Sequence, residues 1–184
     1  MKKFLIAMAF AVATSFAAQP AHSVVFGEDI ERASTDYPWV VSIWHAVPKD
    51  DYYYPICSGS LIAPDAVLTA AHCLTKKGTY SVQIGSDTLD GENEKTFHAV
   101  AAIWKHPFYD DEDFKNDVGL IKLASYQTKV KPEPIADWVD LKAIRDSKSF
   151  ELLGWGEDES GDYATFLGYA KLCLLYTSRA HETP

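Results

Sequence analysis

The sequence predicts a globular protein of the all-β class. Short apolar runs rich in Val, Ile and aromatic residues alternate along the chain with turn-prone segments rich in Pro, Gly and Asp. Of the 184 residues, 47% are hydrophobic and 13% aromatic, which suffices for a packed core and argues against a disordered chain. The length fits one domain.

The formal charge is −9, and Lys and Arg form no cluster along the chain. A surface that binds nucleic acid needs such a cluster to neutralise phosphates. We therefore expect no nucleic-acid partner.

The N-terminus has the three-part layout of a secretory signal peptide. Two lysines precede an apolar run that is too short to span a bilayer, and small residues follow as far as Ser23. Cleavage fits after Ala17, Ala18 or Ser23. We predict a signal peptide over residues 1–23, a secreted or periplasmic protein, and no membrane association after cleavage.

The first half of the chain carries clear strand signals. Residues 37–43 alternate apolar and small polar side chains behind a proline. A polar, aromatic stretch over 48–55 predicts a hairpin tip before the next strand, which contains Ser58 and Ser60. An apolar run over 66–70 predicts the strand that follows.

Similar signals continue beyond this point. Strand-like runs cover 80–85 and 97–104, on either side of an acidic, turn-prone loop over 86–96. His98 is interpreted as a histidine on a strand surface. Residues 118–123 form a short apolar run typical of a buried strand.

The last part of the chain begins with a predicted linker over 129–146, which is rich in Lys, Pro and Asp. An apolar strand from Phe150 follows and ends at Gly154-Trp155-Gly156. Glycine in this setting lets a strand bend and a loop leave sharply.

Cys57 and Cys73 lie sixteen positions apart, and His72 directly precedes the second cysteine. Export to an oxidising compartment favours a disulfide, which would stabilise the fold by about 3 kcal/mol in the chain-entropy model. The alternative is a Cys/His metal site, but one histidine and two adjacent ligands fit a tetrahedral centre poorly. An imidazole held beside a disulfide is fixed in direction, as general-base catalysis requires.

Several segments resemble the trypsin-like serine peptidases of the chymotrypsin fold, in the order found in that family. The run Leu-Thr-Ala-Ala-His-Cys ends at Cys73, and Asn-Asp-Val-Gly-Leu-Ile-Lys-Leu begins at Asn116 behind a His-Pro turn. Gly-Trp-Gly at 154–156 resembles the opening strand of the family's second barrel. The resemblance implies two Greek-key β-barrels, with His72 as general base and Asp117 orienting its imidazole. An acid at the head of a buried strand also needs a partner on physical grounds.

Val24-Val25-Phe26-Gly27 resembles the mature N-terminus of the family, with Phe26 in place of a glycine. The resemblance implies that cleavage before Val24 activates the protein. An ordinary edge strand is the alternative interpretation.

The acidic loop over 86–96 resembles the calcium loop of the trypsins. Its oxygen ligands would be Asp87, Asp90, Glu92, Asn93 and Glu94. Because Ser86 stands where the first glutamate ligand would be, a solvated loop without metal is favoured. We expect no cofactor and no metal elsewhere.

The sequence departs from the family at the nucleophile, which lies there in a Gly-Asp-Ser-Gly-Gly segment that is absent here. Ser160 directly follows Gly-Trp-Gly in a predicted surface loop, and we reject it as a nucleophile. Paired barrels routinely need about 200 to 250 residues. We predict a complete first barrel over 24–130, and over 131–172 a linker with only the beginning of a second barrel, truncated before the catalytic serine.

The end of the chain suggests an origin for this truncation. Cys-Leu-Leu-Tyr-Thr-Ser from Cys173 is what TGT CTC TTA TAC ACA TCT encodes, which resembles a transposon-end adapter used for sequencing libraries. We interpret residues 173–184 as a non-native tail. A natural strand and tail is the alternative.

These observations predict a serine-type endopeptidase by family, acting on protein or peptide substrates and monomeric when complete. The chain as given would be inactive without its nucleophile. The alternative is an exported, non-catalytic binding module with a protease-like fold. The presence of both His72 and Asp117 argues against that alternative, since barrel packing needs neither polar group.

Overall fold

The computed structural model describes six parts of the chain. They are residues 28–48, 52–89, 91, 93–147, 149–156 and 165–173. The predicted signal peptide, Val24, Ser160 and nearly all of the predicted tail lie outside these residues, as do Asp90 and Glu92 of the acidic loop.

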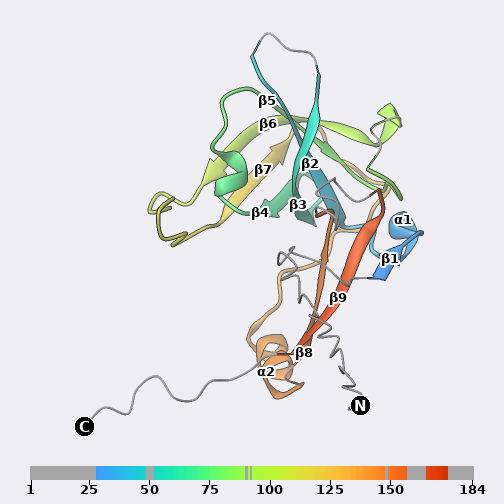
Figure 1. Ribbon diagram of the computed structural model, residues 1–184, viewed down its shortest axis with the longest axis vertical. Helices are drawn as coiled ribbons and strands as arrows, with labels where there is room; N and C mark the ends of the chain where they lie inside the picture. Colours follow the sequence, from blue (N-terminus) through green and yellow to red (C-terminus); the bar gives the residue numbers. More distant parts are fainter. Residues whose placement is uncertain are drawn as a thin grey trace, which may run out of the picture.

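Six antiparallel strands close into a barrel in the order β2-β3-β4-β7-β6-β5 (Figure 1). The strands are β2 (Val40–Ala46), β3 (Tyr54–Ala63), β4 (Ala66–Thr69), β5 (Thr79–Gln83), β6 (Phe97–Lys105) and β7 (Gly119–Leu123). Closure leaves no free strand edge. The predicted all-β fold with a closed first barrel is confirmed.

The barrel is filled by branched apolar side chains from its strands. Val41 and Ile43 of β2, Leu61 of β3, Val67 of β4 and Ile121 of β7 are fully buried in one cluster. Burying one such side chain stabilises a fold by about 1.5–3 kcal/mol. The apolar positions that predicted the strands therefore form the core.

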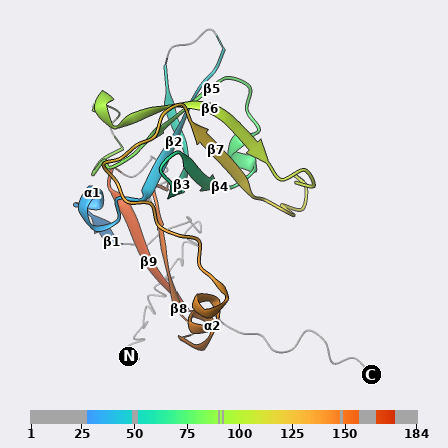
Figure 2. The same ribbon diagram turned by 180° about the vertical axis from the view of Figure 1, so that it is seen from behind.

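A second, three-stranded sheet has the order β1-β9-β8. Its strands are β1 (Glu28–Ile30), β8 (Ser149–Gly154) and β9 (Leu167–Cys173), with helix α1 (Ala33–Asp36) following β1. β8 and β9 leave the barrel as a long ribbon, with helix α2 (Trp138–Ser147) near its far end (Figures 1 and 2). A small cluster of Ala33, Val40, Trp155 and Leu167 joins the ribbon and the barrel.

The segment predicted as a linker over 129–146 contains a helix, α2, which was not predicted from the sequence. The carboxylate of Asp137 accepts the backbone N–H groups of Val139 and Asp140 at 2.7 and 3.0 Å, and the carboxylate of Asp140 accepts the N–H of Asp137 at 3.0 Å. This reciprocal capping satisfies N–H groups that the first turn of a helix leaves unpaired. The described helices are all too short or too polar to cross a membrane.

The first predicted strand also begins later than expected. The N–H of Val40 donates to the carbonyl of Tyr37 at 3.0 Å, so residues 37–39 form a turn and β2 starts at Val40. Pro38 therefore lies in the turn that precedes β2 and not in the strand itself.

Candidate active site

His72 opens the short 3₁₀ helix η1 (His72–Leu74), just beyond the end of β4. The next residue, Cys73, is buried and forms a disulfide with Cys57 of β3, with an S–S distance of 1.99 Å and a Cα–Cα distance of 6.1 Å. The predicted disulfide is confirmed. It ties η1 to β3 and so fixes the backbone that carries the imidazole.

Asp117 stands two residues before β7 and is brought to His72 by the pairing of β4 with β7. Thr69, at the end of β4, lies opposite Gly119, at the start of β7. A Cβ atom on Gly119 would lie 2.7 Å from a side-chain carbon of Leu74 and 3.1 Å from the carbonyl oxygen of Ala70. Glycine thus permits the close approach of β7 to η1.

The carboxylate of Asp117 contacts His72 twice. Oδ2 lies 2.7 Å from Nδ1, and Oδ1 accepts the backbone N–H of His72 at 2.9 Å. An ionised carboxylate can only accept, so Nδ1 carries the proton in this pair. Nε2 of the neutral ring is then left as a proton acceptor, as a general base requires.

The surroundings favour the ionised form of Asp117. Partial burial alone raises its pKa, but the hydrogen bonds and the charge interaction with His72 outweigh this effect and hold the pKa below its ordinary value. The side chain of His72 is 48% exposed and that of Asp117 is 20% exposed. The imidazole can therefore be reached from solvent while the carboxylate is largely covered.

Phe114 is a neighbour of His72 that the sequence did not reveal. Its ring lies edge-on to the imidazole, with 6.0 Å between the centroids, and is 62% exposed. Its φ of 51° is unusual for a residue with a large side chain. The signal available in the sequence was an aromatic residue within an otherwise acidic turn, three positions before Asp117.

The structure argues against a metal site at Cys57, His72 and Cys73. Among the described residues, one group has His, Cys or acidic ligand atoms close enough for a metal, namely Cys57, His72 and Cys73 within 4.8 Å of one another. Both sulfurs are bonded to each other and offer no thiolate.

The acidic loop over 86–96 is partly engaged within the protein. Oδ1 of Asp87 accepts the N–H of Ser34 at 2.7 Å, and Glu94 begins the 3₁₀ helix η2 (Glu94–Thr96). The side chain of Ser86 donates to the carbonyl of Thr88 at 2.9 Å. These contacts give the described part of the loop a structure of its own.

Ser58 and Ser60 lie in β3, as expected. The hydroxyl oxygen of Ser58 accepts the backbone N–H of Trp155 at 2.9 Å. Nε2 of His72 lies 4.0 Å from Sγ of Cys57, and within the described residues no hydrogen bond joins it to either serine. Neither serine is therefore placed to give its proton to the imidazole.

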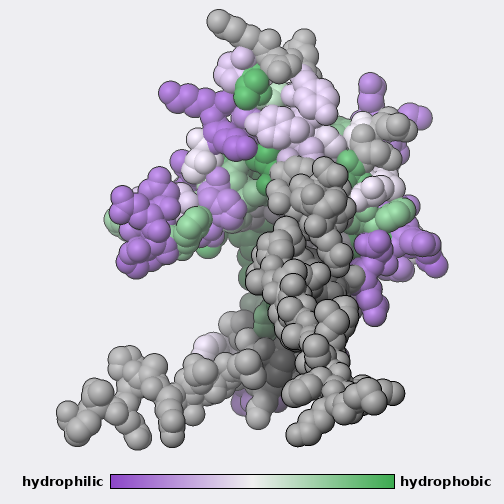
Figure 3. Space-filling view, in the orientation of Figure 1, coloured by the Kyte–Doolittle hydropathy of each residue, from purple (hydrophilic) through white to green (hydrophobic). Residues whose placement is uncertain are grey.

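The connection between β6 and β7 gives the site an acidic border. It contains Asp110, Asp111, Glu112 and Asp113, and projects from the barrel as a cluster of hydrophilic side chains (Figure 3). Asp113 pairs with Lys115, and Oδ1 of Asp110 accepts the N–H of Glu112 at 3.0 Å. The run behaves as a solvated turn, which agrees with its composition.

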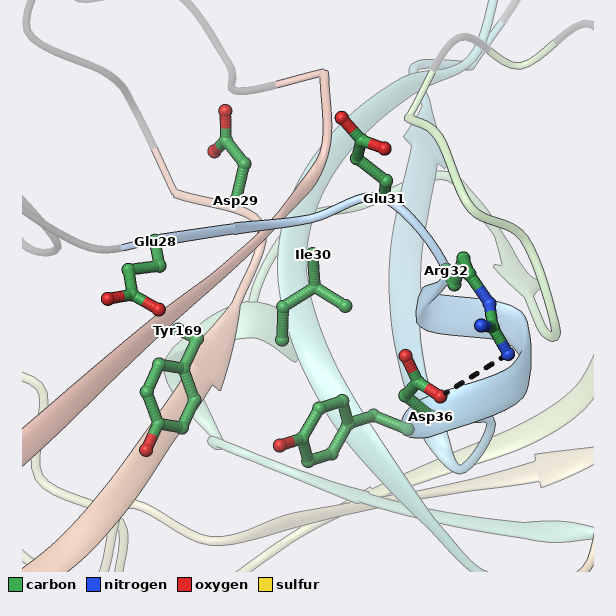
Figure 4. Close-up of a pocket in the computed structure, with 8 residues that line it drawn as sticks. Glu28, Asp29, Ile30, Glu31, Arg32, Asp36 and Tyr169 are labelled. Carbon is green, nitrogen blue, oxygen red and sulfur yellow. Dashed lines mark ion pairs between the residues drawn. The ribbon is translucent and has the colours of Figure 1, made fainter.

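A separate pocket of about 620 Å³ lies between β1, α1 and Tyr169 of β9. Glu28 and Ile30 point to one side of β1, and Asp29 and Glu31 to the other (Figure 4). It is lined by elements other than η1 and β7, so it is distinct from the His72–Asp117 pair.

The family model for Trypsin matches residues 24–182. The chain belongs to the trypsin family. Among curated relatives of this family, chymotrypsin-C of Rattus norvegicus is 33% identical over 142 residues, and chymotrypsin-like elastase family member 3A of Homo sapiens is 36% identical over 122 residues. These alignments cover 72% and 62% of this chain.

The same alignments cover 49% of the rat protein and 44% of the human protein, so the chain spans about half the length of the curated relatives it matches. A solved trypsin-like fold, described as the structure of GrC, aligns with a TM-score of 0.66 at 24% identity. The alignment covers 82% of this chain and 65% of the other chain. At this identity it shows that the two proteins share a fold.

Proposed function

We propose that the chain is the N-terminal part of a secreted serine endopeptidase in which His72 is the general base and Asp117 orients it. The observation that carries this proposal is the double contact of one carboxylate with the ring and the backbone of one histidine, at 2.7 and 2.9 Å. Membership of the trypsin family supports the same chemistry.

In this proposal Nε2 of His72 takes the proton of a serine hydroxyl as the oxygen attacks the carbonyl carbon of a peptide bond. The protonated imidazole then gives that proton to the leaving amine, and the acyl group stays on the serine until water releases it. Asp117 holds the ring in the tautomer with the proton on Nδ1 and stabilises the imidazolium that forms. The reaction is acyl transfer to water.

The nucleophile in this proposal belongs to a part of the protein that lies beyond Leu172. The chain spans about half the length of its curated relatives and contains no Gly-Asp-Ser-Gly segment. Residues 173–184 are, in the same proposal, a non-native tail, and residues 131–172 lead into a second barrel. The 184-residue chain would then hydrolyse no peptide bond, because triad members act as a unit.

Other features of the complete protein remain part of the proposal. The substrates are proteins or peptides, the mature chain begins at Val24 after export, and the complete enzyme is a monomer. It needs no cofactor, and calcium at the 86–96 loop stays a weaker prediction, because Asp87 already accepts an internal hydrogen bond.

The test begins with the genomic sequence past the codon for Leu172. The gene extended to its natural end and the 184-residue form should both be expressed with their export signals and treated with a fluorophosphonate probe that labels active serines. We expect the extended protein to be labelled and the short form to be unlabelled. His72→Ala in the extended protein should abolish labelling, and Asp117→Asn should lower kcat by about 10⁴-fold.

Asp111→Asn, in the exposed turn before Phe114, serves as the matched acid-to-amide control and should leave labelling near that of the wild type. Labelling of the short form would overturn the placement of the nucleophile. A natural continuation without a serine nucleophile segment would favour the non-catalytic binding module instead.

A further inference from the structure

A hollow of about 470 Å³ opens on the barrel between the end of β5, η2, the start of β6 and the segment that follows β7. Tyr126 and Val130 contribute apolar surface to it, the buried Ile84 lies behind this surface, and Lys95 and Lys129 contribute ammonium groups. Its volume falls in the range of pockets that bind small ligands. It shares no residue with the pocket of Figure 4.

Two lysines give the lining positive charge, although the whole chain carries a formal charge of −9. Among the described residues, those that line the hollow include no Asp or Glu. The ion pairs of the described chain involve other cations and leave Lys95 and Lys129 without a carboxylate partner. An acid beside the hollow, Asp87, is bound to the N–H of Ser34.

His98 also lines the hollow. It is partly buried in the hollow, and burial followed by the charge of Lys129 lowers its pKa below the ordinary value. The other charged or titratable side chains that share the lining are Lys95 and Tyr126. A positive potential in a partly enclosed space favours an anionic occupant.

The walls are fixed without any ligand. The buried side chain of Gln127 donates to the carbonyl of Val130 at 2.7 Å and accepts the N–H of Val130 at 2.9 Å. On the other wall, the N–H of Ile84 donates to the carbonyl of Thr96 at 2.9 Å. A prearranged site loses little conformational entropy when a ligand binds.

We propose that this hollow binds an acidic peptide segment of a partner protein. Carboxylates of the segment pair with Lys95 and Lys129, and an aliphatic side chain packs against Tyr126 and Val130. The apolar surface distinguishes a peptide from a sulfated glycan, which would supply charge but no aliphatic side chain. An acidic peptide with an aliphatic side chain matches both the positive charge and the apolar surface of the hollow.

The hollow lies at the opposite end of β6 from the His72–Asp117 pair. His98 is the second residue of β6, whereas Lys105, its last residue, pairs with Gly119 beside Asp117. Seven strand residues span about 23 Å. A peptide in the hollow therefore leaves the histidine open, and the inference does not depend on the proposed catalytic role.

The experiment uses the secreted 184-residue chain and a fluorescein-labelled hexapeptide of alternating Glu and Leu, with fluorescence anisotropy as the readout at about 0.15 M salt. The Lys95→Gln, Lys129→Gln double variant should bind at least about tenfold more weakly than the wild type. A double variant with the same charge change elsewhere, Lys105→Gln with Lys171→Gln, should bind within about twofold of the wild type. A hexapeptide of alternating Gln and Leu should not bind.

Binding should also strengthen as the pH falls from about 8 to about 5.5, because a bound carboxylate favours the protonated imidazole of His98. His98→Gln should remove this pH dependence. In the wild type, NMR signals of Ile84, Val130 and His98 should shift on titration with the peptide, which tests the site even if a variant fails to fold.

Several results would overturn the proposal. These are undetectable binding of the acidic hexapeptide, equal losses in the two double variants, or NMR shifts confined to other residues. Tighter binding of a heparin hexasaccharide than of the peptide, lost in the Lys95→Gln, Lys129→Gln variant, would assign the hollow to sulfated glycans instead.

Discussion

Ser58 of β3 and Trp155, which directly follows β8, are joined by a hydrogen bond of 2.9 Å across 97 positions of sequence. The hydroxyl oxygen accepts the backbone N–H of the residue just beyond the end of β8, a strand of the second sheet. A Cβ atom on Gly154 would stand 3.2 Å from the same oxygen, so glycine allows the two chains to approach. One side chain thus fixes how the ribbon leaves the barrel.

We expect Ser58→Ala to lower the free energy of unfolding by about 1–2 kcal/mol, because the N–H of a largely buried residue loses its acceptor. Urea unfolding, followed by tryptophan fluorescence, measures the change. Ser60→Ala on the same strand is the matched control, since the side chain of Ser60 makes no hydrogen bond with the other described residues. Equal losses in the two variants would contradict the role given to Ser58.

Replacing both Cys57 and Cys73 by alanine should lower the free energy of unfolding by about 3 kcal/mol. The disulfide closes a loop between positions 16 apart and thereby lowers the conformational entropy of the unfolded chain. Urea unfolding under oxidising conditions gives the comparison. Cys173→Ala should have no such effect, because we predict that Cys173 has no disulfide partner.

Asp117 should make the fold more stable at neutral pH than in acid. Its pKa is lowered in the folded state, so the folded chain binds this proton less readily than the unfolded chain does. The stabilisation is complete above the unfolded pKa of about 3.9 and is lost as the pH falls through the lower folded value.

Asp117→Asn should therefore weaken the acid dependence of the free energy of unfolding, measured by urea titration from about pH 7 to about pH 3. Asp111→Asn, in an exposed turn, is the control. An unchanged acid dependence in Asp117→Asn would mean that the contact with His72 does not contribute to stability.

Gly78→Ala should destabilise the barrel by about 3 kcal/mol or more. Gly78 has a φ of +150°, and an added Cβ would lie 2.1 Å from the carbonyl oxygen of Ala46 and 2.6 Å from Nε2 of His45. Gly85→Ala is the control. Its φ of +69° costs about 1 kcal/mol, but the nearest atom, on Val130, is 3.5 Å away. In thermal unfolding, the midpoint temperature of Gly78→Ala should be well below that of Gly85→Ala.

The barrel strands could be predicted because each is short, apolar and bounded by turn residues. The apolar positions on which those predictions rest are fully buried in the closed barrel, as Ile43 and Val67 illustrate. The helix over 138–147 was missed because Lys, Pro and Asp residues dominate its neighbourhood. A capping signal was nevertheless present, in Asp137 followed three residues later by Asp140.

The approach of His72 and Asp117 was expected from a family resemblance, and spacing alone could not have supplied it. Forty-five positions separate them, and their contact depends on the register of β4 against β7. The link from Ser58 to Trp155 left no local pattern, and the aromatic residue in the acidic turn did not by itself indicate that Phe114 contacts His72, because each contact depends on where distant segments meet. Contacts of this kind follow from tertiary packing, which composition and periodicity do not encode.

The pairing of β1 with β9 has a consequence for biosynthesis. Glu28 lies opposite Tyr169, whereas every barrel strand falls between Val40 and Leu123. Chains grow at about 5–20 residues per second, and domains generally fold as units from the N-terminal end during synthesis. The barrel strands can therefore pair with one another without β9, whereas β1, although the first of the described strands to be made, depends on β9 for its partner. The earliest of the described strands thus gains its partner only after the barrel strands have been made, and until then its unpaired edge is open to association with other copies of the chain.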